Sequence, residues 1–599
     1  MRHVLVALAA VVAFAATGFG VRTQPSQPPG GAALNPQFEQ LVESYLKEVR
    51  GVGAAPTVAD MSAASFGAQV DTMRALLRDL TAIDRKTLTF DQDIDYRFLE
   101  SLLKSGILKR ERVKRWQQDP RLYIDTRLLS YRLDADPRPL DPRARDITQD
   151  IKALEVRVAN GTKNLAQYLP RWIELTNAML DGELVIFSRQ IPAFADRLAG
   201  DQKVALLAES TKGLAALKDY RVFINTELPK KAPGDYKIGT DTYNALHETE
   251  YMFDDADVNL RRIARGSPGF TRAPGFYDWG WKQFGTMEKK LTVKARQIDP
   301  TRTWLQIIRE MKQDHPAAEQ LIFAHLEAAR RSRQWVIDKD LVSIPWKDDD
   351  DIMVAAPPSY AMMQWWGFSG TLPAGVKSRK SAWTMIMPNP DWSDEMFESN
   401  LTEKDYSFMN VIAPHETYPG HHLQRLYQNE IPRRLRVYEN SYSNQSWCYY
   451  IEWELAPNYG FYPKDKQALY ELEMLRLKLW RMGRVIIDSG LHTGRLSYSD
   501  AVQLESERIG FVRYGGQINI DGITAGGSDT AAPTLGYFEL MLLREDYFKK
   551  MRELDQRGSL KDFHDRVYKI GFLPVTLIRD ALMHQLEAEF RRPASTNSR

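Results

Sequence analysis

The stretch Pro414-His415-Glu416-Thr417-Tyr418-Pro419-Gly420-His421-His422 decides how the rest of the chain is interpreted. Three of the ten histidines in this 599-residue sequence fall within it, and a glutamate directly follows the first of them. Neutral imidazole is the commonest protein ligand for metal ions, and a catalytic zinc site also needs a carboxylate beside its water. The stretch therefore predicts a zinc site with His415 as a ligand and Glu416 as the general base. The alternative is a helix terminus with incidental histidines.

The second ligand depends on how the chain runs after His415. In the H-E-x-x-H motif both histidines lie on one helix face, but here Pro419 occupies the position of the second histidine. On a straight helix His422 returns to nearly the same face, whereas His421 points roughly 120° away. A kink at Pro419 would instead bring His421 inward and leave His422 as a hydrogen-bonding neighbour. Gly420 favours the kink, because glycine tolerates a distorted backbone.

Glu452 is the candidate for a third zinc ligand. It lies in the segment 445–454, which is predicted to be a buried helix whose charged residues are Glu452 and Glu454. A carboxylate among aromatic side chains costs free energy unless it is paired or binds a cation. The alternative is a buried ion pair with an arginine. On the same helix, Gln445 is expected to hydrogen-bond a ligand, and Cys448 is expected to be a small packing residue.

Tyr514 is the candidate for stabilising an oxyanion. The segment 507–514 is expected to end a helix and to open a glycine-rich loop that runs to Gly536. A tyrosine hydroxyl or an arginine guanidinium beside a polarised carbonyl can stabilise the developing negative charge. The alternative for Tyr514 is an ordinary surface or core residue.

Apolar residues recur at helical spacing over most of the chain after Asn35. The periodicity is clear in residues 38–46, 96–103, 145–158, 185–217, 304–336 and 467–487. Alternation typical of strands is limited to short stretches at 341–345 and 382–387. The sequence therefore predicts a mainly α fold with a few short strands.

Composition excludes several classes of protein. The net charge is only +2, with 80 basic and 78 acidic residues, and we find no basic tract or phosphate-binding glycine loop. A nucleic-acid partner is therefore not expected. A mass of 68.8 kDa with 43% hydrophobic residues allows a large core. Residues 35–599 are predicted to form a single large helical domain, or two closely packed lobes.

The N-terminus has the features of a signal for export. Arg2 and His3 precede an apolar run, residues 4–16, that is too short to span a bilayer and is followed by small residues. Residues 1–22 are predicted to be a signal peptide, and residues 23–34 a flexible linker rich in proline, glycine and serine. The alternative is an uncleaved membrane anchor.

Cys448 is the only cysteine, so no disulfide can form within the chain. Because no cysteine ends the apolar run, acylation there is not expected. The sequence thus predicts a free periplasmic or secreted protein, not a lipoprotein, with no stable membrane insertion after cleavage of the signal.

The chain also resembles a bacterial family known as domain of unknown function 885. Members of that family tend to be exported and carry an H-E-x-x-P-G-H-H segment, matched here by residues 415–422. The resemblance extends over residues 35–589. Other similar pieces are Asp235–Gly239, Asp340–Pro345, Ala356–Pro358, Phe563–Asp565 and Gly571–Pro574.

The family is similar to the zinc metallopeptidases of the thermolysin-like and all-helical carboxypeptidase-like group. The resemblance implies a large helical metallopeptidase-like fold with a central cleft, and a peptide or other amide as substrate. It also implies a set of site residues: zinc on His415 and on His421 or His422, Glu416 as the base, and Glu452 as third ligand.

Two departures from the family pattern support a second hypothesis. Relatives typically have a glutamate where this chain has Gln445, and a shorter connection after Tyr514. The first hypothesis is an exported zinc-dependent hydrolase, most simply a peptidase. The second is a catalytically silent protein that holds a peptide or partner in an aromatic cleft around Trp365 and Trp366.

Overall fold

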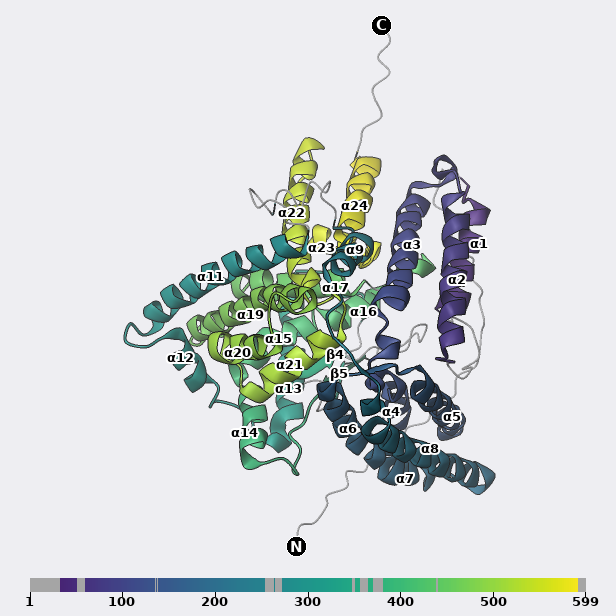
Figure 1. The fold of residues 1–599 in the computed structure, drawn as a ribbon. Helices are drawn as coiled ribbons and strands as arrows, with labels where there is room; N and C mark the ends of the chain where they lie inside the picture. Colours follow the sequence, from purple (N-terminus) through teal and green to yellow (C-terminus); the bar gives the residue numbers. More distant parts are fainter. Residues whose placement is uncertain are drawn as a thin grey trace.

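The computed structural model describes residues 33–50, 60–134, 136, 138–253, 263, 272–346, 351–355, 365–369, 381–437 and 440–590. The predicted signal peptide and most of the predicted linker lie outside these residues. The described part of the chain is mainly helical, as predicted (Figure 1).

The first half of the chain supplies helices that, apart from the last of them, lie along one side and beneath the rest in the view of Figure 1. They are α1 (Pro36–Ser44), α2 (Ala63–Thr81), α3 (Phe90–Leu108), α4 (Arg127–Asp134), α5 (Leu140–Asn164), α6 (Pro170–Val185), α7 (Ile191–Ala195), α8 (Gly200–Thr226) and α9 (Thr240–Glu250).

The second half supplies the helices that surround the histidine stretch. They are α11 (Ala273–Ile298), α12 (Trp304–Met311), α13 (Leu321–Asp338), α14 (Asp394–Thr402), α15 (Tyr406–Glu416), α16 (His421–Gln428), α17 (Ser441–Tyr450), α18 (Ala456–Asn458), α19 (Gln467–Thr493), α20 (Tyr498–Gln503), α21 (Arg513–Ala525), α22 (Ala532–Glu553), α23 (Leu560–Ile570) and α24 (Val575–Phe590). α11 runs alongside α19, and α17 packs on α22.

The described strands are short and form two small sheets. β5 (Ser381–Met385) lies between β3 (Asp351–Ala355), which is parallel to it, and β4 (Gly367–Ser369), which is antiparallel. β1 (Gln167–Tyr168) pairs in parallel with β2 (Ala232–Pro233). β5 overlaps the strand predicted at 382–387.

The strand predicted at 341–345 is wrong, because side chains satisfy its backbone instead of a neighbouring strand. The Ser343 N–H donates to Asp565 Oδ1 at 2.7 Å, and the Ser343 carbonyl accepts from the Tyr427 hydroxyl at 2.7 Å. Leu341 and Val342 bury their side chains in the core. Buried backbone groups need partners, but those partners need not come from a strand.

Two hydrophobic cores organise the helices. The larger combines residues 38–103 with residues 243–586, so α1–α3 pack against helices from the far end of the sequence. The buried residues of the smaller core lie between 123 and 228, mostly in helices α4–α8, and Met61 packs against them. Arg171 of α6 joins the two regions through an ion pair of 2.7 Å with Asp521 of α21.

The start of α15 is fixed by a buried carboxylate. Asp405 caps the helix by accepting from the backbone N–H groups of Ser407, at 2.9 Å, and Phe408, at 3.1 Å. α13 and α19 pack against α15. The helix that carries His415 and Glu416 is therefore held at its first turn and along its length.

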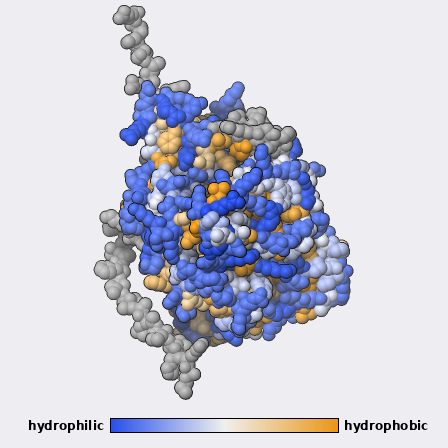
Figure 2. Space-filling model, turned by 90° about the vertical axis from the view of Figure 1, so that its left-hand side faces the viewer, coloured by the Kyte–Doolittle hydropathy of each residue, from blue (hydrophilic) through white to orange (hydrophobic). Residues whose placement is uncertain are grey.

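Hydrophilic residues predominate on the face shown in Figure 2, where apolar ones form small scattered patches. Within the described ranges, we find no helix that is both long and apolar enough to cross a bilayer.

The packing of α17 on α22 predicts the effect of one substitution. A Cβ at Gly536 of α22 would overlap the Ser446 hydroxyl and the Tyr442 ring of α17, both buried. Gly536→Ala should therefore lower the free energy of unfolding by about 1–3 kcal/mol. Gly522→Ala is the matched control, because that glycine of α21 has no heavy atom within 4 Å of the added methyl group.

Thermal unfolding followed by circular dichroism measures both variants. The control should be neutral or gain up to about 1 kcal/mol from helix propensity. Equal melting temperatures for the two variants would show that α17 and α22 are not closely packed at Gly536.

Candidate metal centre

The chain makes a sharp turn between the helices that carry the first two histidines. α15 ends at Glu416, and α16 begins at His421. Gly420 lies so close to the end of α15 that a Cβ would overlap the His415 carbonyl oxygen. Only glycine fits there, so this residue permits the turn that the kinked course requires.

Two aromatic side chains from distant segments hold the turn in place. The Trp447 indole N–H donates to the Pro419 carbonyl at 3.0 Å, and the Tyr568 hydroxyl donates to the same oxygen. Trp447 Nε1 and Tyr568 Oη are themselves 2.9 Å apart. The turn between the histidines is thus anchored to α17 and α23.

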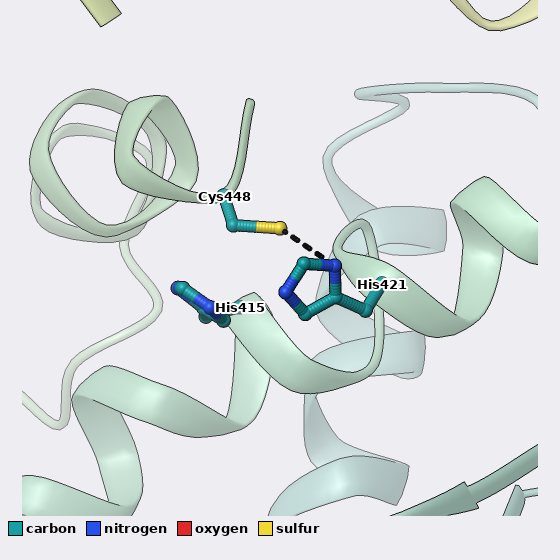
Figure 3. A group of neighbouring side chains, drawn as sticks. All are labelled: His415, His421 and Cys448. Atoms are coloured by element: carbon teal, nitrogen blue, oxygen red, sulfur yellow. Dashed lines mark hydrogen bonds between the residues drawn. The ribbon is translucent and has the colours of Figure 1, made fainter. Parts of the chain in front are cut away.

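The turn brings His421, and not His422, to His415. The His415 and His421 rings lie edge to face with centroids 4.9 Å apart (Figure 3). His422 instead places Nε2 3.0 Å from the Tyr418 hydroxyl. The straight helix that would have favoured His422 is therefore not the course that the chain takes.

Glu452 orients the His415 ring. Its Oε1 lies 2.5 Å from His415 Nδ1 and 3.3 Å from Arg481 Nη2. Burial disfavours the charged carboxylate, but Arg481 and His415 outweigh burial and hold the pKa of Glu452 below its usual value. His415 Nδ1 therefore donates to a carboxylate, which leaves Nε2, 3.8 Å from Glu416 Oε1, as the nitrogen available to a metal.

The predicted third-ligand position of Glu452 thus differs from its place in the structure. The carboxylate lies at Nδ1 of His415, and the arginine partner that we considered as the alternative is present as Arg481. Carboxylate, histidine and metal in series is a recurrent arrangement, in which the carboxylate fixes the ring and raises its basicity. The position of Glu452 suits that supporting role.

His421 is held in its neutral form. Burial lowers its pKa well below the usual value, and the charges of His415 and Arg425 lower it further. Nδ1 lies 2.9 Å from Gln424 Oε1, and Nε2 lies 2.9 Å from Gln445 Nε2. A neutral imidazole is the form that binds metal ions.

Cys448 is the residue that the sequence did not indicate as part of the site. Within the described part of the chain, His415, His421 and Cys448 offer ligand atoms that all lie within 4.8 Å of one another, and all three are buried. Figure 3 shows the three side chains converging from separate elements. Cys448 lies about one helical turn after Gln445, and this spacing was the signal that could have identified it.

Nitrogen and sulfur donors are those that zinc prefers in proteins. The centre offers two imidazoles, one oriented by a carboxylate and one kept neutral by burial, with a thiol beside them. These residues therefore fit a zinc ion.

Tyr514 lies in α21, so the prediction that a glycine-rich loop opens at this residue is wrong, whereas its role toward an oxyanion stays a prediction. α21 includes Gly515 and Gly516, and Tyr514 stacks on Trp365 with ring centroids 6.4 Å apart. A Cβ at Gly515 would be 2.7 Å from the Trp365 ring. Gly515 is therefore needed because the Trp365 ring lies close to its backbone, and it does not belong to a loop.

The tryptophans proposed to line a cleft are both buried. Trp365 stacks on Trp392, and the Trp366 indole N–H donates to Glu403 Oε2 at 3.3 Å. A cavity of about 630 Å³ is lined by Tyr459, Arg544 and Arg552 among others, and none of the three histidines of the stretch lines it. The larger part of the aromatic stretch around Trp365 lies outside the described residues.

Two solved structures share this fold at low sequence identity. A protein from Shewanella oneidensis, described as "a putative lipoprotein of unknown function", is 18% identical with a TM-score of 0.69, over 91% of this chain and 99% of that one. A "putative lipoprotein from Colwellia psychrerythraea" is 14% identical with a TM-score of 0.71, over 92% of this chain and 99% of that one. No curated protein matches the sequence.

These descriptions contradict the prediction that the protein is not a lipoprotein, since both similar proteins are described as lipoproteins. The prediction relied only on the lack of a cysteine after the apolar run at residues 4–16. That segment lies outside the described residues, and one missing acylation site is too narrow a basis for excluding a lipid anchor.

Sequence comparison gives the family directly. Residues 47–582 match the family described as bacterial protein of unknown function (DUF885). The match includes the histidine turn, the helix that carries Cys448, Glu452 just beyond it, and most of both hydrophobic cores. The chain therefore belongs to the DUF885 family of bacterial proteins.

Proposed function

We propose that the protein is a zinc-dependent hydrolase that cleaves amide bonds, most simply those of peptides, with zinc held by His415 and His421. One observation carries the proposal. The two rings meet at 4.9 Å between centroids, while Glu452 occupies Nδ1 of His415 and leaves Nε2 available. Glu452 is already paired with Arg481, so what a zinc ion would bind is the lone pair at Nε2 of His415.

In this proposal Glu416 is the general base. It follows His415 at the last turn of α15, with its Oε1 3.8 Å from His415 Nε2. When bound, zinc supplies Lewis-acid activation of water and of a substrate carbonyl. Glu416 would accept the proton of the attacking water and pass it to the leaving amine. Arg481 would keep Glu452 ionised, so that the His415 ring holds its orientation.

The choice between the neighbouring histidines gives the first test. His421→Ala should remove a ligand and lose nearly all bound zinc. His422→Ala is the matched control; it removes a partner of Tyr418 and should weaken zinc binding by no more than about 10- to 100-fold.

Elemental analysis of dialysed protein and competition with a chromophoric chelator give stoichiometry and affinity for both variants. About one zinc per wild-type chain is expected for a site of this kind. Zinc retained in full by His421→Ala but lost by His422→Ala would contradict the assignment, and metal-free wild-type protein would remove the proposal itself.

The role of Glu416 gives the second test. Glu416→Gln should keep zinc but slow amide cleavage by at least about 100-fold, since general-base catalysis contributes that much or more. Glu430→Gln, at the exposed turn after α16, is the control and should change neither property.

A peptide library, digested with and without a chelator and analysed by mass spectrometry, detects cleavage at any peptide sequence that the enzyme prefers. Wall-derived amides run in parallel extend the search beyond peptides. Undiminished cleavage by Glu416→Gln would place the base elsewhere.

A catalytically silent binding protein is the second candidate, and Gln445 is the observation in its favour. Its neutral amide lies 2.9 Å from His421 Nε2, at the position where the family resemblance implies a glutamate. Under this alternative the same library would be retained by the protein and recovered uncut. Trp365 and Trp366, around which the aromatic cleft was first suggested, are both buried in the described part of the chain.

A further inference from the structure

We propose that Cys448 supplies a thiolate as the third ligand of the metal centre, so that the site has a His-His-Cys donor set. The inference rests on the metal site of the proposed function, but not on the reaction. It assigns to this chain a nitrogen and sulfur site that selects zinc or another borderline-soft divalent ion.

The spacing of Cys448 and His421 matches that of two ligands in a tetrahedral zinc site. Cys448 Sγ lies 3.5 Å from His421 Nδ1. Zinc–nitrogen and zinc–sulfur bonds of about 2.0–2.1 Å and about 2.3 Å, at a tetrahedral angle, place the two donors roughly 3.5 Å apart. The ligand nitrogen of His415, the third donor, lies within 4.8 Å of the other two donor atoms. Three donors leave the fourth position open, as in catalytic zinc sites.

Glu452 is not part of the cluster of ligand atoms within 4.8 Å of one another. It contacts His415 Nδ1 and Arg481 through Oε1, while its buried Oε2 has no hydrogen-bond partner among the described residues. Gln445 offers a neutral amide, which carries no charge to balance the ion. Cys448 is fully buried beside the two rings, and a coordinating thiol is deprotonated outright, with its proton released to solvent.

Gln445 and His421 can rearrange so that His421 binds the ion through Nδ1. In the arrangement described, Gln445 Nε2 donates to His421 Nε2, and Nδ1 therefore carries the proton. If the Gln445 amide turns by half a rotation, its Oε1 faces His421 and accepts a hydrogen bond from Nε2–H. The proton of His421 then lies on Nε2, and the Nδ1 lone pair, on the side of Cys448, is available to the ion. Gln424 Oε1, 2.9 Å from Nδ1, would then turn away, and the Gln424 amide would give up its bond of 3.0 Å to the Asn444 carbonyl. Gln445 would hold His421 as Glu452 holds His415.

X-ray absorption at the zinc edge tests the inference on the wild-type protein. Because Cys448 is the only cysteine, any sulfur bound at about 2.3 Å must come from it or from a methionine thioether. Cobalt substitution separates these two, since a thiolate gives an intense ligand-to-metal charge-transfer band and a thioether does not. We expect one sulfur neighbour and that band in the wild type.

Cys448→Ala and Cys448→Ser should lose the band and weaken zinc binding by more than the roughly 100-fold upper value for an orienting residue. His422→Ala should keep the band. Because the main result comes from unmodified protein, a variant that fails to fold does not remove the test. Bound zinc with only nitrogen and oxygen neighbours would overturn the inference and leave the proposed hydrolase standing. A wild-type chain that binds no zinc would overturn both.

Discussion

The metal centre depends on the contact between Gly420 and the carbonyl oxygen of His415. Because no side chain fits between them, the chain can reverse within a few residues, and the first residue of α16 comes to the last turn of α15. Any larger residue would separate the two imidazoles. Trp447 and Tyr568 then fix the turn through the Pro419 carbonyl, so the geometry of the site rests on backbone contacts and not on the histidines themselves.

Orientation of the rings is supplied by a second set of residues. Glu452, fixed by Arg481, holds Nδ1 of His415, and Gln445 contacts Nε2 of His421. Such supporting groups reduce the conformational freedom that ion binding would otherwise have to overcome. Their difference in charge also matters. A carboxylate behind one ring and a neutral amide behind the other leave the centre with less negative charge than two carboxylates would.

Local sequence patterns predicted the features that local physics determines. Helical spacing of apolar residues located helices such as α1, α3, α5, α8, α13 and α19, and Pro419 with Gly420 indicated a kink. Features decided by distant partners were missed. The backbone at Ser343 is satisfied by a carboxylate 222 residues away, and Gly515 is required by the ring of Trp365. Cys448 meets the two histidines only because three separate elements converge on one point, which no single segment of sequence records.

The two hydrophobic cores have a consequence for synthesis of the chain on the ribosome. Helices α4–α8 bury their apolar side chains among residues 123–228, so this unit can close while the remainder is still being translated. Helices α1–α3 cannot complete their packing so early. Arg97 of α3 pairs with Asp580 of α24, 483 residues later, so the part of α3 that faces α24 stays uncovered until almost the entire polypeptide is made. A nascent chain stalled before α24 would therefore expose that part of α3, and needs protection from aggregation until translation ends.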